Sequence, residues 1–287
     1  MKGCLTKVLI ALVLLHQPAQ AQTRDVSLLR MPSWPRAAGL ADIGAATNLP
    51  EGLFYNPALA GAVNAIAGSA HFFGSDSMLT TVVAGLTTGA ANVGVAMQVL
   101  RADLVPSGYS LTTATSLGAS LRLKGIRWGA ALKHLQLVEG AIKDDGVVVD
   151  LGAQRQIGVF STGLAVQNLG TDLNLAGEDI ELPTKVTLAA EGQGLPIGAF
   201  VDFGATAAIA VDRDGEVLPA IGGQVLYTPL DGWTFTARAG VRRPAPSSNM
   251  RPVTGGLAIT LDRLTIDYAI EAVKRGPTVH RIGARLR

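Results

Sequence analysis

Apolar and polar side chains alternate along much of this chain, and this alternation limits the folds that the chain can adopt. Along Trp233–Arg242, apolar or small residues at odd positions alternate with polar or small residues at even positions. The same alternation runs through residues 253–262 and 264–271. A helix would spread such residues around its circumference, whereas a strand sorts them onto two faces. The pattern therefore predicts β-strands that each carry one apolar face.

Stretches rich in Gly, Asp and Pro separate successive segments of about nine to twelve residues from residue 63 onward. Counting these segments predicts about 14 strands, an even number whose lengths suit tilted membrane strands of about 9–11 residues. The strands are expected to start near Val63, Met78, Asn92, Thr112, Ile126, Val147, Val159, Lys185, Ile197, Glu216, Trp233, Val253, Leu264 and Thr278.

Composition separates a membrane barrel from a soluble β-protein. Only 16% of the residues are charged, against about 25% in ordinary globular proteins, and beyond the N-terminus no apolar run reaches the length of a membrane helix. A soluble β-sandwich or secreted barrel is the alternative, but its core needs bulky residues, whereas the second face here is rich in Gly, Ala, Ser and Thr. We expect an all-β, antiparallel transmembrane β-barrel. Trp128, Tyr227 and Trp233 lie near turns, where an aromatic girdle would stand.

The first 21 residues have the pattern of a secretory signal. Lys2 and Lys7 make the start positive, residues 8–15 are apolar, and residues 19–21 form a small-x-small cleavage site. A run of about eight residues is too short for a retained membrane anchor. Cys4 precedes the apolar run, which argues against a lipoprotein. We expect cleavage after residue 21 and export to a bacterial outer membrane.

Cleavage would change the charge balance and remove the single cysteine. The 24 basic residues of the chain would become 22, against 22 acidic ones, which gives no reason to expect a nucleic-acid partner. Loss of Cys4 would exclude disulfides, thiol catalysis and cysteine metal sites.

No catalytic or cofactor motif is visible. The chain lacks a nucleophile elbow, a P-loop and a zinc-protease helix. The histidines His71, His134 and His280 are scattered singly. Asp212 and Asp214 resemble the opening of a calcium loop without its later ligands, so a β-turn is expected there. We expect no enzyme and no catalytic, cofactor-binding or metal-binding residues.

Three stretches resemble the PorV/PorQ family of outer-membrane barrels, which is related to the FadL-type transporters. The first comprises residues 36–46 and the Asn-Pro-Ala motif at 56–58, the second is the Asn-Leu-Gly motif at 168–170 with Pro183, and the third runs from 226 to 283. Two features depart from the family pattern. Ala41 and Asp42 interrupt its N-terminal glycine cluster, and the chain closes on Leu286-Arg287 rather than on an aromatic residue.

The resemblance implies an N-terminal hatch inside the barrel, with Arg36, Gly39, Asn56 and Pro57 as its motif residues. Pro57 fixes its own φ and favours an extended Asn56, which gives a rigid bend, and a barrel of about 14 strands is wide enough to need a filler. The expected division is a signal peptide at 1–21, a hatch at 22–61 and an outer-membrane β-barrel at 62–287. A surface tail with one turn is the alternative to the hatch.

The resemblance also implies a role in protein secretion, as cargo handling of the type IX kind, or in outer-membrane assembly. Two alternatives remain: a FadL-like channel for hydrophobic small molecules, and a structural barrel without transport. The expected loops at 101–111, 168–184 and 243–252 are short for a cargo binder. The expected partners are outer-membrane lipid and either secreted cargo proteins or hydrophobic small molecules.

The last hairpin allows a register prediction. If its turn centres on Gly276, then Glu271 faces Arg281 and Asp267 faces Arg285 on the polar, lumen side. A slip by one residue would send all four charges into lipid. The alternative is that these charges are wetted in the lumen without pairing.

Overall fold

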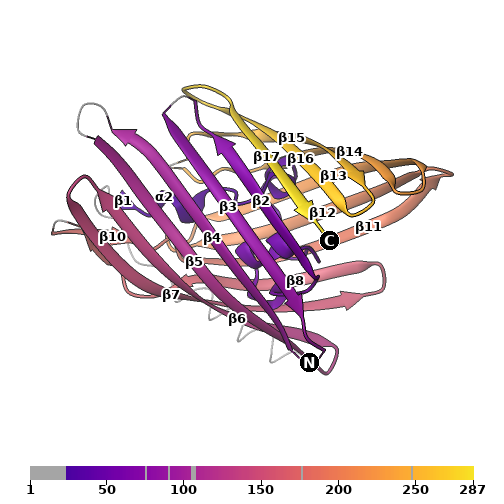
Figure 1. The fold of residues 1–287 in the computed structure, drawn as a ribbon, viewed down its shortest axis with the longest axis horizontal. Helices are drawn as coiled ribbons and strands as arrows, with labels where there is room; N and C mark the ends of the chain where they lie inside the picture. The colour runs from indigo at the N-terminus through magenta and orange to yellow at the C-terminus, as the bar shows by residue number, and fades with distance from the viewer. Residues whose placement is uncertain (1–23, 75, 90, 105–107, 176, 247) are drawn as a thin grey trace.

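The computed structural model describes residues 24–287 apart from 75, 90, 105–107, 176 and 247, so the expected signal at 1–21 lies outside the described residues. Within the described part, fourteen antiparallel strands form a closed barrel in which β17 pairs with β2 and β8 pairs with β11 (Figure 1). The barrel strands are β2 (Ala65–Phe72), β3 (Ser77–Thr87), β4 (Ala91–Leu104), β5 (Gly108–Leu123), β6 (Ile126–Glu139), β7 (Ile142–Ile157), β8 (Phe160–Leu169), β11 (Lys185–Gly198), β12 (Val201–Asp212), β13 (Val217–Leu230), β14 (Trp233–Arg242), β15 (Met250–Leu261), β16 (Leu264–Val273) and β17 (Val279–Leu286).

The prediction of an antiparallel barrel of about 14 strands is confirmed. The strands β4 to β7 are longer than expected, with 14 to 16 residues each. Consequently the loop expected at 101–111 is mostly strand, because β4 continues to Leu104 and β5 begins at Gly108. Among the described residues, no helix is both long and apolar enough to cross a bilayer.

The two faces of the strands differ as the alternation requires. On β14, Trp233 and Val241 point outward with about half of their surface exposed, at 48% and 51%, whereas Arg238 on the lumen face is 9% exposed. An apolar outer face and a largely polar inner face suit a barrel surrounded by lipid. Trp128 and Tyr227 also lie on the outer face.

The two ends of the barrel differ in their connections. At one end, here the short-turn end, two-residue turns join β5 to β6, β7 to β8, β11 to β12, β13 to β14 and β15 to β16. At the other, the long-loop end, β8 is joined to β11 through residues 170–184 and β14 to β15 through 243–249. In outer-membrane barrels the short turns are periplasmic and the long loops extracellular.

The register expected for the last hairpin is wrong by two residues. Ala269, not Glu271, pairs with Arg281, and Glu271 pairs with Val279. In this register Asn249 of the neighbouring loop bonds both the N–H and the carbonyl of Arg275 at the turn, a contact between loops that the hairpin's own sequence does not encode. A shift of two keeps every side chain on its predicted face, so the four charges still point into the lumen.

The N-terminal segment lies inside the ring of strands (Figure 1). It contains α2 (Ser27–Arg30), α3 (Pro35–Gly39) and the 3₁₀ helices η1 (Pro50–Phe54) and η2 (Pro57–Leu59). We call residues 33–61 the plug and residues 26–32 the strap. Within the plug, α3 lies against β14 to β17 and η2 against β5 to β7, so the plug crosses the lumen between nearly opposite walls.

The strap runs to the long-loop end. There β1 (Arg24–Asp25) pairs with β10 (Glu178–Glu181), which pairs with β9 (Leu173–Leu175), a small sheet that the sequence did not predict. The strap buries Val26 and Leu28 against lumen-facing apolar residues of the wall and the loop, namely Leu79, Leu100, Ala114, Leu135, Leu137, Val148, Leu173, Ile180 and Leu182. The lumen is therefore apolar beside the strap, unlike the Gly, Ala, Ser and Thr-rich face expected throughout.

Candidate functional site: the lumen plug and outer pocket

Glycines in the wall allow the plug backbone to approach closely. A Cβ on Gly163 of β8 would overlap the carbonyl oxygen of Ala45, and one on Gly129 of β6 would overlap the backbone of Pro57. At the opposite wall, a Cβ on Gly39 would lie 3.2 Å from Cα of Gly256 on β15. These positions form a fitted seat for the plug rather than a loose cavity around it.

Wall side chains satisfy backbone groups of the plug. Gln167 donates from Nε2 to the carbonyl of Phe54 at 2.8 Å. Ser161 donates to the carbonyl of Ala46 at 2.7 Å, and Ser120 donates to that of Ala60 at 2.9 Å. Buried backbone groups need such partners, so these polar wall residues hold an irregular segment inside the lumen.

The Asn-Pro-Ala motif is anchored on both sides. Asn56 is fully buried, and its Oδ1 accepts from the backbone N–H of Ala58 at 3.0 Å, which caps η2. Its Nδ2 donates to the carbonyls of Ala45 in the plug, at 2.8 Å, and Ala153 of β7, at 3.1 Å. Pro57 occupies the first position of η2, where no N–H is needed. Asn56 thus ties two parts of the plug to the wall.

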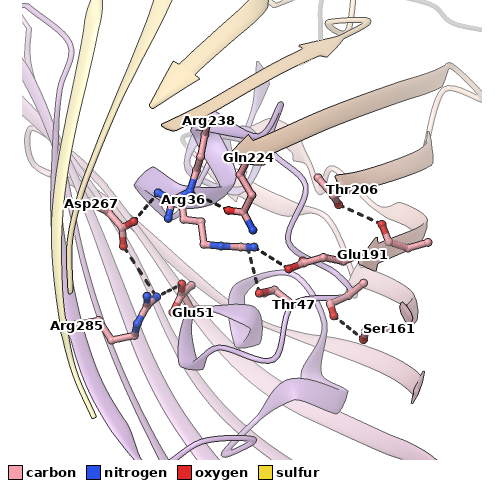
Figure 2. Close-up of polar contacts among 12 residues, drawn as sticks. Arg36, Thr47, Glu51, Ser161, Glu191, Thr206, Gln224, Arg238, Asp267 and Arg285 are labelled. Atoms are coloured by element: carbon pink, nitrogen blue, oxygen red, sulfur yellow. Dashed lines mark hydrogen bonds and ion pairs between the residues drawn. The ribbon is translucent and has the colours of Figure 1, made fainter. Parts of the chain in front are cut away.

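Two ion pairs join the plug to the barrel (Figure 2). Arg36 of α3 pairs through Nη2 with Oε1 of Glu191 on β11 at 2.7 Å, and it also donates to Thr47 at 3.1 Å. Glu51 of η1 pairs with Nη1 of Arg285 on β17 at 2.5 Å. Each of these charged side chains is at most 5% exposed. Because the partners stand on different walls, the pairs fix the plug from two sides.

The wall charges around these pairs form a continuing network. Asp267 of β16 accepts from Arg238 of β14 at 2.6 Å and lies 4.0 Å from Arg285 (Figure 2). On the same strand, Glu271 accepts from Nη2 of Arg242 at 2.6 Å and from Nε of Arg281 at 2.7 Å.

Arg281 also contacts the strap and a neighbouring strand. Its Nη1 lies 2.6 Å from Nδ1 of His71 on β2 and 3.4 Å from the carbonyl oxygen of Pro32. The four charges singled out in the sequence are therefore gathered in the lumen, through diagonal contacts rather than the direct opposition that was expected. They are Asp267, Glu271, Arg281 and Arg285.

Sequence reasoning missed several members of this network. Arg238 stands on the polar face of β14, and it reaches β16 because the strand between, β15, carries the small lumen residue Gly256. Arg242 lies on the same face, so the alternation on β14 could have shown both. Glu51 and Glu191 could not be paired from sequence, because their partners come from folding the plug back into the lumen.

The Asn-Leu-Gly motif is not part of this network and lies where β8 reaches the long-loop end of the barrel. Asn168 adopts a positive φ of 60°, where the register between β7 and β8 breaks. Its side chain accepts from Nζ of Lys133 at 2.8 Å and donates to the carbonyl of Pro183 at 3.0 Å. Lys133 also pairs with Asp150 at 3.0 Å. The motif thus turns the chain out of the barrel wall into the loop at 170–184.

A cavity of about 590 Å³ lies between the strap and the wall at the long-loop end. We call it the outer pocket. One side consists of residues from β11 to β14 and the other of strap and plug residues, and its volume falls within the range of ligand sites, roughly 300–1,000 Å³. The wall residues are Lys185, Thr187, Ala208, Ala210, Asp212, Leu218, Ala220 and Arg242, and the residues opposite include Leu29, Met31, Asp42, Ile43 and Tyr55.

Some polar groups of the outer pocket are paired within the plug and others are not. Tyr55 donates to Oδ1 of Asp42 at 2.9 Å and accepts from the backbone N–H of Ser33 at 3.0 Å. Burial raises the pKa of the Asp42 carboxyl above its usual value. Oγ1 of Thr187 and Nε of Arg242 are buried without a hydrogen-bond partner among the described residues. Such groups are rare in native proteins and mark a place for water or a ligand.

A surface latch lies beside the pocket. Arg213 of the β12–β13 turn forms a two-pronged ion pair with Asp172 of the β8–β11 loop, at 2.6 and 3.0 Å. The hydrogen bonds from Arg213 lower the pKa of Asp172. The latch joins the β8–β11 loop, which contains the pocket residue Pro183, to the β12–β13 turn, which follows the pocket residue Asp212.

Comparison with known proteins supports the fold. The structure is similar to the CymD monoaromatic hydrocarbon channel, with a TM-score of 0.59 and 12% identity over 88% of this chain and 97% of that one. It is also similar to the P. putida toluene transporter TodX, with a TM-score of 0.56 and 10% identity over 80% of this chain and 90% of that one. Neither the models of known protein families nor the curated proteins gave a match to the sequence.

At such low identity, these similarities show the fold alone. The shared fold is a closed antiparallel outer-membrane β-barrel, as in CymD and TodX. Nothing in the comparisons supports the narrower resemblance to PorV/PorQ or a role in type IX secretion.

Proposed function

We propose that this chain is an outer-membrane channel for small, mainly apolar molecules, and that the plug restricts passage through its lumen. The outer pocket carries this proposal, since it is a mostly apolar cavity of ligand size at the end where long loops face the cell exterior. A molecule bound there would lie between the strap and the wall, against plug residues 41–45.

Three further observations support a channel over a purely structural barrel. The lumen is wide enough to enclose a plug, whereas a small structural barrel fills its interior with its own side chains. The lumen beside the strap is lined by Leu79, Leu135 and other apolar side chains. CymD and TodX, which share the fold, are described as a hydrocarbon channel and a toluene transporter.

Secretion of protein cargo is the competing function. It rests on the resemblance to PorV/PorQ alone, and the longest connection at the long-loop end, 170–184, has 15 residues. We expect the mature chain in the outer-membrane fraction, with heat-modifiable migration on gels. Recovery in the soluble periplasm without detergent would contradict both functions.

Uptake through the pocket is the direct test. 2-Methylnaphthalene is added outside proteoliposomes whose outer leaflet contains lipopolysaccharide, and its arrival in the interior is followed by fluorescence. Ala220→Trp fills the pocket, whereas Ala237→Trp adds the same bulk on the lipid face and serves as the control. We expect Ala220→Trp to reduce uptake to the rate of protein-free vesicles. Equal uptake by both variants would contradict the proposal.

A further inference from the structure

We propose that the outer pocket selects a flat molecule with an apolar middle, an anionic group at one end and a hydroxyl group at the other. This inference rests on the proposed function and names the ligand class of the same pocket. Such a ligand differs from a pure hydrocarbon at both ends.

The wall of the pocket has an apolar floor, three alanines and one leucine, between two polar margins. Ala210 pairs across strands with Leu218, and Ala208 with Ala220, so β12 and β13 form the floor. On its two borders, Thr187 of β11 pairs with Ala210, and Arg242 of β14 pairs with Ala220. Apolar strap residues complete the pocket opposite this floor. A shallow floor opposed by apolar side chains fits a flat apolar body.

Both margins carry buried polar atoms that the described residues do not satisfy. Oγ1 of Thr187 has no partner, and a threonine hydroxyl can accept or donate a hydrogen bond. Arg242 uses Nη2 for Glu271 and keeps Nε unpaired. The strand spacing of about 4.8 Å places β11 and β14 roughly 14 Å apart at the backbone. The two side chains reach into this gap from both borders, and we therefore propose a two-ring body as the part of the ligand that lies between them.

The net charge of the lining indicates whether the charged group of the ligand is an anion or a cation. Basic side chains outnumber carboxylates in the lining, with Arg30, Lys185, Arg242 and Arg243 against Asp42 and Asp212. The Asp42 carboxyl accepts a hydrogen bond from Tyr55 and interacts electrostatically with Lys185 and Arg242, so the two carboxylates offset only part of the positive charge of the four basic side chains.

The pairing of Arg242 leaves positive charge at its margin. Its partner Glu271 also accepts from Arg281, so one carboxylate serves two guanidinium groups. An anion therefore fits the Arg242 margin, which also offers an N–H donor, and a hydroxyl fits the Thr187 margin.

Binding of three matched probes to the detergent-solubilised full protein tests this assignment by calorimetry. The probes are 6-hydroxy-2-naphthoate, 2-naphthoate and 2-methylnaphthalene, which share one flat body and lose one polar end at each step. We expect 2-naphthoate to bind about 10-fold or more tightly than 2-methylnaphthalene, and the hydroxyl to add about 5-fold.

Variants assign each end of the ligand to a residue. Thr187→Val should weaken 6-hydroxy-2-naphthoate about 5-fold and leave 2-naphthoate unchanged. Arg242→Gln should weaken both acids about 10-fold or more, and Arg242→Lys less. The control Arg101→Gln removes a positive charge outside the pocket, on a side chain that is 63% exposed, and should change neither.

Several outcomes would overturn the inference. Equal affinity for all three probes would contradict the proposed ligand class without contradicting the channel proposal. A preference for the acids that persists in Arg242→Gln would have the same consequence. If 6-hydroxy-2-naphthoate still binds more tightly than 2-naphthoate in Thr187→Val, Thr187 does not bind the hydroxyl group. Failure of all three probes to bind would instead contradict the proposed function, because the pocket would then hold no such ligand.

Discussion

Replacing Glu51 by alanine removes one of the two ion pairs that fix the plug. In the structure Glu51 Oε1 lies 2.5 Å from Nη1 of Arg285, and the two side chains are 2% and 5% exposed. A second anion, Asp267, is 4.0 Å from Arg285 and is already bonded to Arg238. Glu51→Ala therefore leaves Arg285 buried with an incomplete counter-charge.

The magnitude follows from that burial. Removing one partner of a buried ion pair costs roughly 3–5 kcal/mol, because the remaining charge keeps its desolvation penalty. Since Asp267 offsets part of this penalty, we take the lower limit, about 3 kcal/mol. At about 1.4 kcal/mol per tenfold, the ratio of unplugged to plugged barrels should rise about 100-fold.

Single-channel recording in a planar bilayer measures this ratio as the fraction of time spent in the conducting state. Glu216→Ala is the matched control, since Glu216 pairs with Arg243 on the surface, where the side chains are 38% and 58% exposed and such a pair contributes about 0–1 kcal/mol. Adding Arg285→Ala to Glu51→Ala should recover part of the loss, because no unpaired cation remains. If Glu51→Ala conducts no more often than Glu216→Ala while its barrel still migrates as folded, the reasoning is refuted.

Three further predictions concern the seat, the register and the pH response. Gly163→Val should displace the plug and raise conductance, while Gly68→Val on the outer face of β2 should not; equal conductance would contradict the seat. Tyr268→Cys with Ile282→Cys should crosslink faster than Ile270→Cys with Ile282→Cys, and the reverse order would restore the register first expected. Because burial raises the pKa of Asp42, its ionised form costs stability at neutral pH, and this cost fades as the pH falls toward the unfolded-state value. Asp42→Asn should therefore raise the melting temperature at pH 7 by an amount that shrinks in acid; a constant difference would exclude Asp42 as its source.

The barrel could be predicted from the sequence because its signal is local and repeated. Each strand shows its two faces within about ten residues, and the two-residue turns leave little freedom between neighbours. The register of the last hairpin escaped prediction because the turn residue Arg275 is bonded by Asn249 of another loop, a contact that no local pattern encodes.

The site was less predictable, because it is built from contacts across the lumen. Asn56 and Pro57 could be singled out by their backbone chemistry, and in the structure they begin η2 against β7. The pairing of Arg36 with Glu191 spans 155 residues, and no local pattern encodes it. The outer pocket could not be predicted, because its lining combines alanines of β12 and β13 with strap residues that are distant in the sequence.

Conductance after removal of the plug shows whether this segment restricts passage through the lumen. A variant lacking residues 34–60, joined by a short Gly-Ser linker and shown to be folded by heat-modifiable migration, is compared with the parent in the same planar bilayer. We predict a steady, high conductance for the deletion and rare, brief openings for the parent, because the plug crosses the lumen between nearly opposite walls. Equal conductance in the two folded proteins would contradict the claim that this segment restricts the channel.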